Sequence, residues 1–120
     1  MKIILAMALI AAAPAFADCP YPPTPGKLPD GASASMQDML DGQKTVKEYE
    51  KAVNDYTSCI DKDLDDQIAK AGDQLKPERK TEMQRVEAQK HNAAVDQLQS
   101  IADRFNEQVK VFKAKQAEKK

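Results

Sequence analysis

Apolar side chains recur at steps of three and four residues in two long series along this chain. The first series covers residues 36–71 and the second covers residues 83–112. Steps of three and four place side chains on one face of an α-helix. The pattern therefore predicts two amphipathic helices, over about residues 35–71 and 77–115, that need each other to cover their apolar faces.

Local signals predict where these helices begin and end. Ser35 followed by Asp38 is typical of a capping box at a helix N-terminus. Gly72 suits the position after a helix C-terminus, and Pro77 suits the first turn of the next helix. Gly42 lies inside the first helix, where glycine costs about 1 kcal/mol relative to alanine, so we expect a weak point there.

A register check favours an antiparallel arrangement of the two helices. If the loop is centred near Gln74, facing residues have numbers that sum to about 148. Val53 then faces Val95, and Ile60 faces Ala88, so the two series match almost end to end. The predicted fold class is all-α, an antiparallel two-helix hairpin that resembles a coiled coil. Its apolar band is thinnest near the loop, which we expect to be the more dynamic end.

The first 17 residues have a different character. Lys2 precedes an apolar run over residues 3–13, and a small-x-small pattern ends at Ala17. This order is typical of a secretory signal peptide, and the run is shorter than the roughly 20 residues of a membrane-spanning helix. We expect cleavage after Ala17, a periplasmic or secreted location and no membrane insertion afterwards. Lipidation of Cys19 is the weaker alternative, because the charged Asp18 precedes it.

Residues 18–34, here called the arm, hold five prolines that favour an extended conformation. The chain has two cysteines, Cys19 and Cys59, and an even number in an exported protein predicts a disulfide. Cys59 lies about 36 Å along the first helix from Ser35. An extended chain of about 50 Å separates Cys19 from the same point, so the bond forms only if the arm runs back along the helix.

Four stretches of the chain stand out together. They are Leu28-Pro29-Asp30-Gly31, Ser35-Met36-x-x-Met39, Tyr56-x-x-Cys59, and residues 91–96 continuing to Phe105-Asn106. They resemble a group of small exported proteobacterial helical proteins with a Pro-rich N-terminus, whose function is uncharacterised. The resemblance covers most of the chain after residue 17, and it implies an exported helical fold and no activity.

The charges and the reactive residues narrow the function. With Lys2 set aside, 17 basic residues oppose 19 acidic ones, so the basic excess of nucleic-acid-binding proteins is absent. The chain has one histidine, His91, and its cysteines are expected to be bonded, so nothing supplies an activated nucleophile or an acid–base pair. We expect no enzyme activity and no cofactor. The Lys-rich residues 110–120 either fray into water or touch an anionic surface.

A metal site is the one candidate for inorganic chemistry. Met36 and Met39 are one helical turn apart, and thioethers bind Cu(I). Methionine is also a common filler of helical cores, which is the better interpretation here. In the proposed register His91 lies roughly 25–30 Å from the two methionines. A copper carrier is therefore a minor alternative.

The remaining hypotheses concern protein partners. A narrow apolar stripe on two long helices favours a protein-interaction or self-associating module, with an unknown protein or a second copy as the partner. A holdase-like periplasmic chaperone, or an inhibitor of a secreted protein, is the alternative. The residues predicted to form the interaction surface are Tyr49, Tyr56, His91, Asn92 and Asn106.

Overall fold

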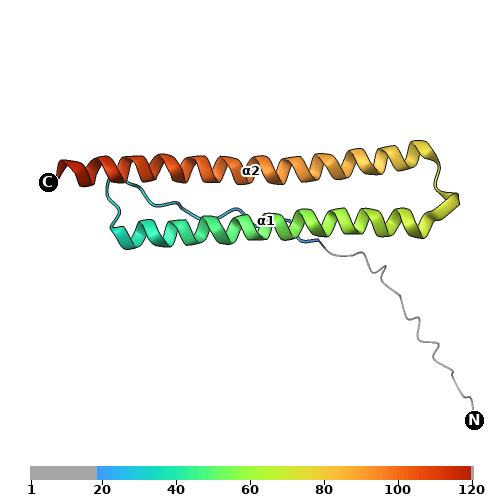
Figure 1. Cartoon of the computed structure of the whole chain (residues 1–120), viewed down its shortest axis with the longest axis horizontal. Coiled ribbons are helices and arrows are strands. Elements are labelled where there is room, and N and C mark those ends of the chain that lie inside the picture. Colours follow the sequence, from blue (N-terminus) through green and yellow to red (C-terminus); the bar gives the residue numbers. More distant parts are fainter. Residues whose placement is uncertain (1–18, 120) are drawn as a thin grey trace, which may run out of the picture.

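The protein is a long antiparallel helical hairpin, as Figure 1 shows. The computed structural model describes residues 19–119, which contain the helices α1 (Met36–Ala71) and α2 (Pro77–Glu118) and no strand. A short 3-10 turn, η1 (Gly72–Gln74), begins the connection between the helices. The all-α hairpin prediction is confirmed, although α2 extends a few residues beyond the predicted end. The predicted signal peptide, residues 1–17, lies outside the described residues.

The predicted helix boundaries have the expected caps. The Ser35 hydroxyl accepts a hydrogen bond from the Asp38 N–H at 3.1 Å, and the Asp38 carboxylate accepts one from the Ser35 N–H at 2.9 Å. Gly72 has a φ of 50°, which favours glycine, and its N–H donates to the Ile68 carbonyl. Pro77 is the first residue of α2. These caps satisfy backbone groups that a helix end leaves unpaired.

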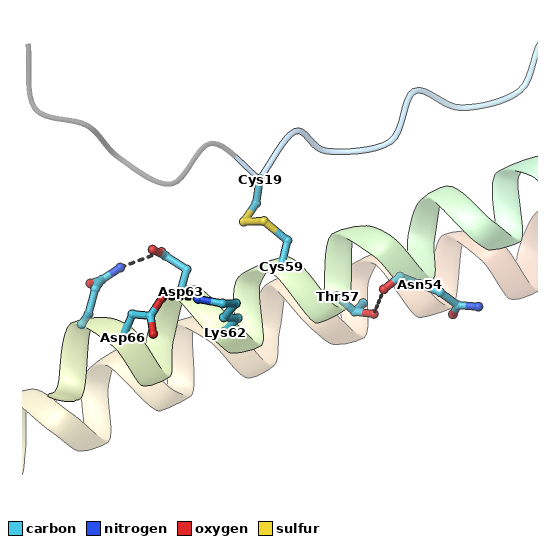
Figure 2. The surroundings of a disulfide bond; sticks show 8 residues. Cys19, Asn54, Thr57, Cys59, Lys62, Asp63 and Asp66 are labelled. Carbon is cyan, nitrogen blue, oxygen red and sulfur yellow. Dashed lines mark hydrogen bonds and ion pairs between the residues drawn. A yellow bond between two sulfur atoms is a disulfide. The ribbon is translucent and has the colours of Figure 1, made fainter.

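The arm runs back along the hairpin, between α1 and α2, as far as the middle of α1 (Figure 1). There the Cys19–Cys59 disulfide joins it to α1, with a Cα–Cα distance of 5.7 Å (Figure 2). The predicted pairing and the reversed direction of the arm are both confirmed. The arm therefore acts as a third element that covers one side of the groove between the helices.

The buried side chains form two clusters, both on the part of the hairpin that the arm covers. The central cluster consists of Tyr49, Val53, Tyr56, Ile60, Ala94 and Ile101. The end cluster consists of Met39, Phe105 and Phe112, against which Leu28 of the arm packs. Between Ile60 and Ala94 no described residue is fully buried. The loop half of the molecule therefore has a thin core, as the sequence predicts.

The predicted apolar series of α2 is buried or half-buried from Met83 to Phe112, except at two positions. Ala94 is fully buried, whereas Val95 is 39 % exposed. Similarly, Ala88 is exposed and Glu87 is half-buried. The predicted facings of Val95 and Ala88 are therefore wrong. The physical reason is that Ala94 and Val95 are adjacent apolar residues, of which only one can face α1.

Two glycines permit the close approach of the arm. A Cβ atom on Gly42 would lie 2.7 Å from the Pro29 Cγ and 2.8 Å from the Phe105 Cε2. A Cβ atom on Gly31 would overlap the Gln108 carbonyl oxygen of α2. The glycine at position 42 makes room for Pro29 and Phe105, and the weak point expected there stays a prediction.

Candidate functional site

A cavity of about 310 Å³ lies between the loop halves of α1 and α2, and is here called the distal groove. Its floor is apolar and consists of Ile60, Leu64, Met83 and Val86. Its rim is polar and consists of Asp63, Gln67, Arg79, Glu82, Glu87 and Lys90. Of the floor residues, Ile60 is buried and the other three are half-buried, so apolar surface remains open to solvent.

The distal groove continues the groove that the arm fills. Asp63 lies four residues after Cys59, and therefore one turn further along the face of α1 to which the arm is bonded (Figure 2). On α2 the arm contacts Gln108, and Lys90 lies 18 residues earlier, which is five turns and the same face. Among the described residues, the arm extends along α1 no further than the disulfide, so none of them covers the loop half of this side (Figure 1).

The rim of the distal groove carries charges of both signs. The Arg85 guanidinium donates two hydrogen bonds to the Glu82 carboxylate, at 2.6 and 2.9 Å, and these bonds lower the pKa of Glu82. Asp63 accepts a hydrogen bond of 2.7 Å from the Gln67 amide. Arg79 and Lys90 supply the positive side of the rim. The rim is therefore suited to the alternating polar groups of a peptide rather than to a ligand of one charge.

Glu87 is the unusual member of this site. Its Oε1 is buried and has no hydrogen-bond donor among the described residues. A hydrogen-bond interaction with the Asp61 side chain, followed by burial, raises the pKa of Glu87. The sequence did not point to Glu87, because a carboxylate does not belong to the apolar series from which the site was predicted.

The five residues predicted as an interaction surface do not lie on one surface. Tyr49 and Tyr56 are 4 % and 7 % exposed and belong to the central cluster, so their assignment to a surface is wrong. Burial raises the pKa of both hydroxyls. His91 is half-buried, while Asn92 and Asn106 are exposed. That Asn92 and Asn106 contact a partner stays a prediction.

The tyrosines are buried because the arm covers them. The ring of Tyr21 packs edge-on against Tyr56, with ring centroids 5.0 Å apart. Such edge-to-face pairs are favourable beyond the area that they bury. Tyr21 itself stays 51 % exposed. Solvent therefore reaches Tyr21 of the arm rather than Tyr49 and Tyr56 of α1.

The structure does not bring the candidate metal ligands together. Met36 is 60 % exposed, whereas Met39 is buried beside Phe105. His91 lies 14 residues before Phe105 on the same helix, a separation of about 21 Å. Among residues 19–119 no three His, Cys, Asp or Glu side chains form a group that could hold a metal ion.

Sequence signals for the distal groove were present but incomplete. Leu64 and Met83 belong to the two apolar series, and Cys59 marks where the arm ends. Together they indicate apolar residues that the arm does not reach. The depth of the groove was not predictable, because it depends on the rotation of α2 about its own axis.

Within residues 19–119, neither helix has a stretch apolar and long enough to cross a membrane. Comparisons of the chain with family models, with curated proteins and with solved structures gave no match. The resemblance to small exported proteobacterial proteins stays a prediction, and the candidate site rests on the geometry described above.

Proposed function

We propose that the protein is an exported periplasmic module that binds an extended, apolar segment of another protein in the distal groove. The observation that carries this proposal is the continuity of one groove along the hairpin. Its proximal half holds the arm, and its distal half offers a floor of Leu64, Met83 and Val86 that none of the described arm residues covers.

The arm indicates which kind of occupant fits. It is extended and rich in proline, and its described residues form one hydrogen bond to the helices, from the Gly31 N–H to the Gln108 side-chain oxygen at 2.8 Å. The rest of its contact is made by apolar groups such as Leu28 and Pro29. The distal groove, with a cavity of about 310 Å³, continues the line of this arm, so a second extended segment with two or three apolar side chains fits it.

Export is supported by two features of the chain. The order of basic, apolar and small residues before Asp18 is typical of a signal peptide. The Cys19–Cys59 bond is of the kind that persists in oxidising compartments. N-terminal sequencing of the protein recovered from a periplasmic fraction tests this part of the proposal. We expect Asp18 as the first residue, and a chain that starts at Met1 in the cytoplasm would contradict it.

Selection of peptides from a displayed library on the oxidised protein tests the binding proposal. We expect enriched peptides to be proline-containing and apolar. A Leu64→Asp substitution should weaken their binding at least about tenfold, because a buried leucine side chain contributes about 1.5–3 kcal/mol. Fluorescence anisotropy with a labelled enriched peptide measures this change.

Leu40→Asp is the matched control for the library experiment. Leu40 is 50 % exposed and lies outside the distal groove, so its substitution should leave the affinity unchanged. Equal binding to all three proteins would overturn the proposal. Sedimentation equilibrium tests whether a second copy of the chain occupies the groove instead. A dimer that Leu64→Asp dissociates would show that the distal groove serves self-association rather than a foreign partner.

A further inference from the structure

Burial along the arm repeats every three residues. One series is buried or half-buried, and it consists of Cys19, Pro22, Pro25, Leu28 and Gly31. Between Cys19 and Leu28, every residue outside this series is exposed. A polyproline II helix has three residues per turn, so this is the pattern of such a helix with one edge on the hairpin. Its other two edges face solvent.

The two outward edges of the arm carry prolines and an aromatic side chain. Pro20 and Pro23 lie one turn apart on one edge, with the spacing Pro-x-x-Pro. The other edge begins with Tyr21 and ends with Lys27. Tyr21 remains 51 % exposed, although its ring packs edge-on against Tyr56. Pro-x-x-Pro segments in this conformation are recognised by grooves that aromatic side chains line.

The backbone of the arm is also open to a partner. Within residues 19–119, the carbonyl oxygens of residues 20–29 accept no hydrogen bond. This agrees with polyproline II geometry, which has no internal hydrogen bonds. The indole N–H of tryptophan and the hydroxyl of tyrosine are donors that an aromatic groove can offer to such carbonyls. The outward edges therefore present both apolar side chains and hydrogen-bond acceptors.

The conformation of the arm is fixed before any partner binds. The disulfide to Cys59 holds one end of the arm, and the hydrogen bond from the Gly31 N–H to Gln108 holds the other end (Figure 2). A free proline-rich peptide loses conformational freedom when it binds, whereas the arm has lost that freedom on folding. Ligands that are held in their bound conformation bind more tightly for this reason.

We propose that the outward edges of the arm are a docking surface for a partner domain that has a groove lined by aromatic side chains. Pro20 and Pro23 fill the spaces between the partner's aromatic rings, and Tyr21 packs at the rim of its groove. In this interaction the protein is the ligand, whereas in the distal groove it is the receptor. The docking surface goes beyond the proposed function and does not require it.

Photocrosslinking in intact cells tests this proposal, with the photoreactive aromatic residue p-benzoylphenylalanine in place of Tyr21. We expect one adduct, in which mass spectrometry places the crosslink beside a tryptophan or tyrosine of the partner. The purified partner should then bind the oxidised parent protein in isothermal titration calorimetry. Pro20→Ala and Pro23→Ala should each weaken this binding at least about fivefold, because each removes a side chain at the centre of the contact.

Two variants serve as controls in the calorimetry. Pro25→Ala also removes one proline, but from the edge that faces the hairpin, so it should bind like the parent protein. Leu64→Asp alters the distal groove alone and should also bind normally, so the failure of either proposal is recognised separately.

Three results would overturn the docking surface. The first is the absence of an adduct from position 21, and the second is an adduct with another copy of this chain. The third is a partner that binds Pro23→Ala as well as it binds the parent protein, or that is weakened equally by Pro25→Ala. Thermal melting followed by circular dichroism establishes that the proline variants are folded.

Discussion

At the scale of single residues, Gly31 shows how tightly the arm is fitted to α2. Its N–H donates to the Gln108 side chain at 2.8 Å, and the residue is buried. The φ angle of Gly31 is not positive, so a larger residue would be excluded by space rather than by backbone strain. Gly72 differs from Gly31, because its φ of 50° is unfavourable for any residue that has a side chain.

A Gly31→Ala substitution should therefore loosen the arm. The added Cβ would meet the Gln108 carbonyl oxygen and would lie 2.8 Å from the Phe112 backbone nitrogen, and backbone atoms cannot rotate away. Overpacking of this kind costs typically about 1–3 kcal/mol. Urea denaturation followed by circular dichroism measures the loss of unfolding free energy.

Gly26→Ala is the control for this prediction. No atom lies within 4 Å of a Cβ built on Gly26, so the substitution should be neutral, or stabilise the protein by up to about 1 kcal/mol through the unfolded chain. If Gly31→Ala and Gly26→Ala proved equally stable, the close contact between the arm and α2 would be disproved.

At the scale of elements, the arm substitutes for a third helix. Two helices alone leave one side of their apolar stripes open, and the arm covers that side with Pro22, Leu28 and Pro29 over the half of α1 that precedes Cys59. Proline suits this role because it restricts the unfolded arm and lowers the entropy lost when the arm is ordered. The disulfide fixes the far end of the arm, so that it cannot peel away from Tyr56.

Removing the disulfide should release this element. The bond closes a loop with a sequence separation of 40 residues, which corresponds to about 3–4 kcal/mol of stabilisation. A Cys19→Ser/Cys59→Ser double variant should lose stability of that order, and limited proteolysis should cut it in residues 19–34. The parent protein should behave the same way in dithiothreitol, and the double variant should not respond to it. An arm that stays protected in the reduced protein would show that packing alone holds it.

Helix ends and the arm's direction were predictable because they depend on local chemistry and on reach. Ser35, Gly72 and Pro77 each mark a boundary through their own hydrogen bonds or φ angle. Which of the adjacent apolar residues Ala94 and Val95 faces inward was not predictable from the pattern, because both fit the series and only their burial in the folded hairpin distinguishes them. Glu87 does not belong to the apolar series, so the candidate site was predictable only in its apolar residues.

At the scale of the whole molecule, the hairpin is built as two halves of different stability. Among the described residues, every buried apolar side chain lies no further along α1 than Ile60 and no earlier along α2 than Ala94. The half beyond Cys59 is held by half-buried side chains, surface ion pairs and the capped loop. Local opening requires less free energy where fewer apolar groups are buried. A surface that binds a partner through a local change of conformation should therefore lie in the half beyond Cys59.

Hydrogen exchange should reveal the two halves directly. At pH 7 we expect backbone amides in residues 62–71 and 77–90 to exchange at least about tenfold faster, relative to their intrinsic rates, than amides in residues 49–60 and 98–109. The reason is that residues 49–60 and 98–109 open only when the central cluster separates. Residues 62–71 and 77–90 open with the cluster intact. Reduction of the disulfide should narrow this difference by lowering protection in residues 49–60 while leaving residues 77–90 nearly unchanged. Uniform protection along both helices would mean that the hairpin opens as one unit, and the thin core of the loop half would then have no consequence for its motion.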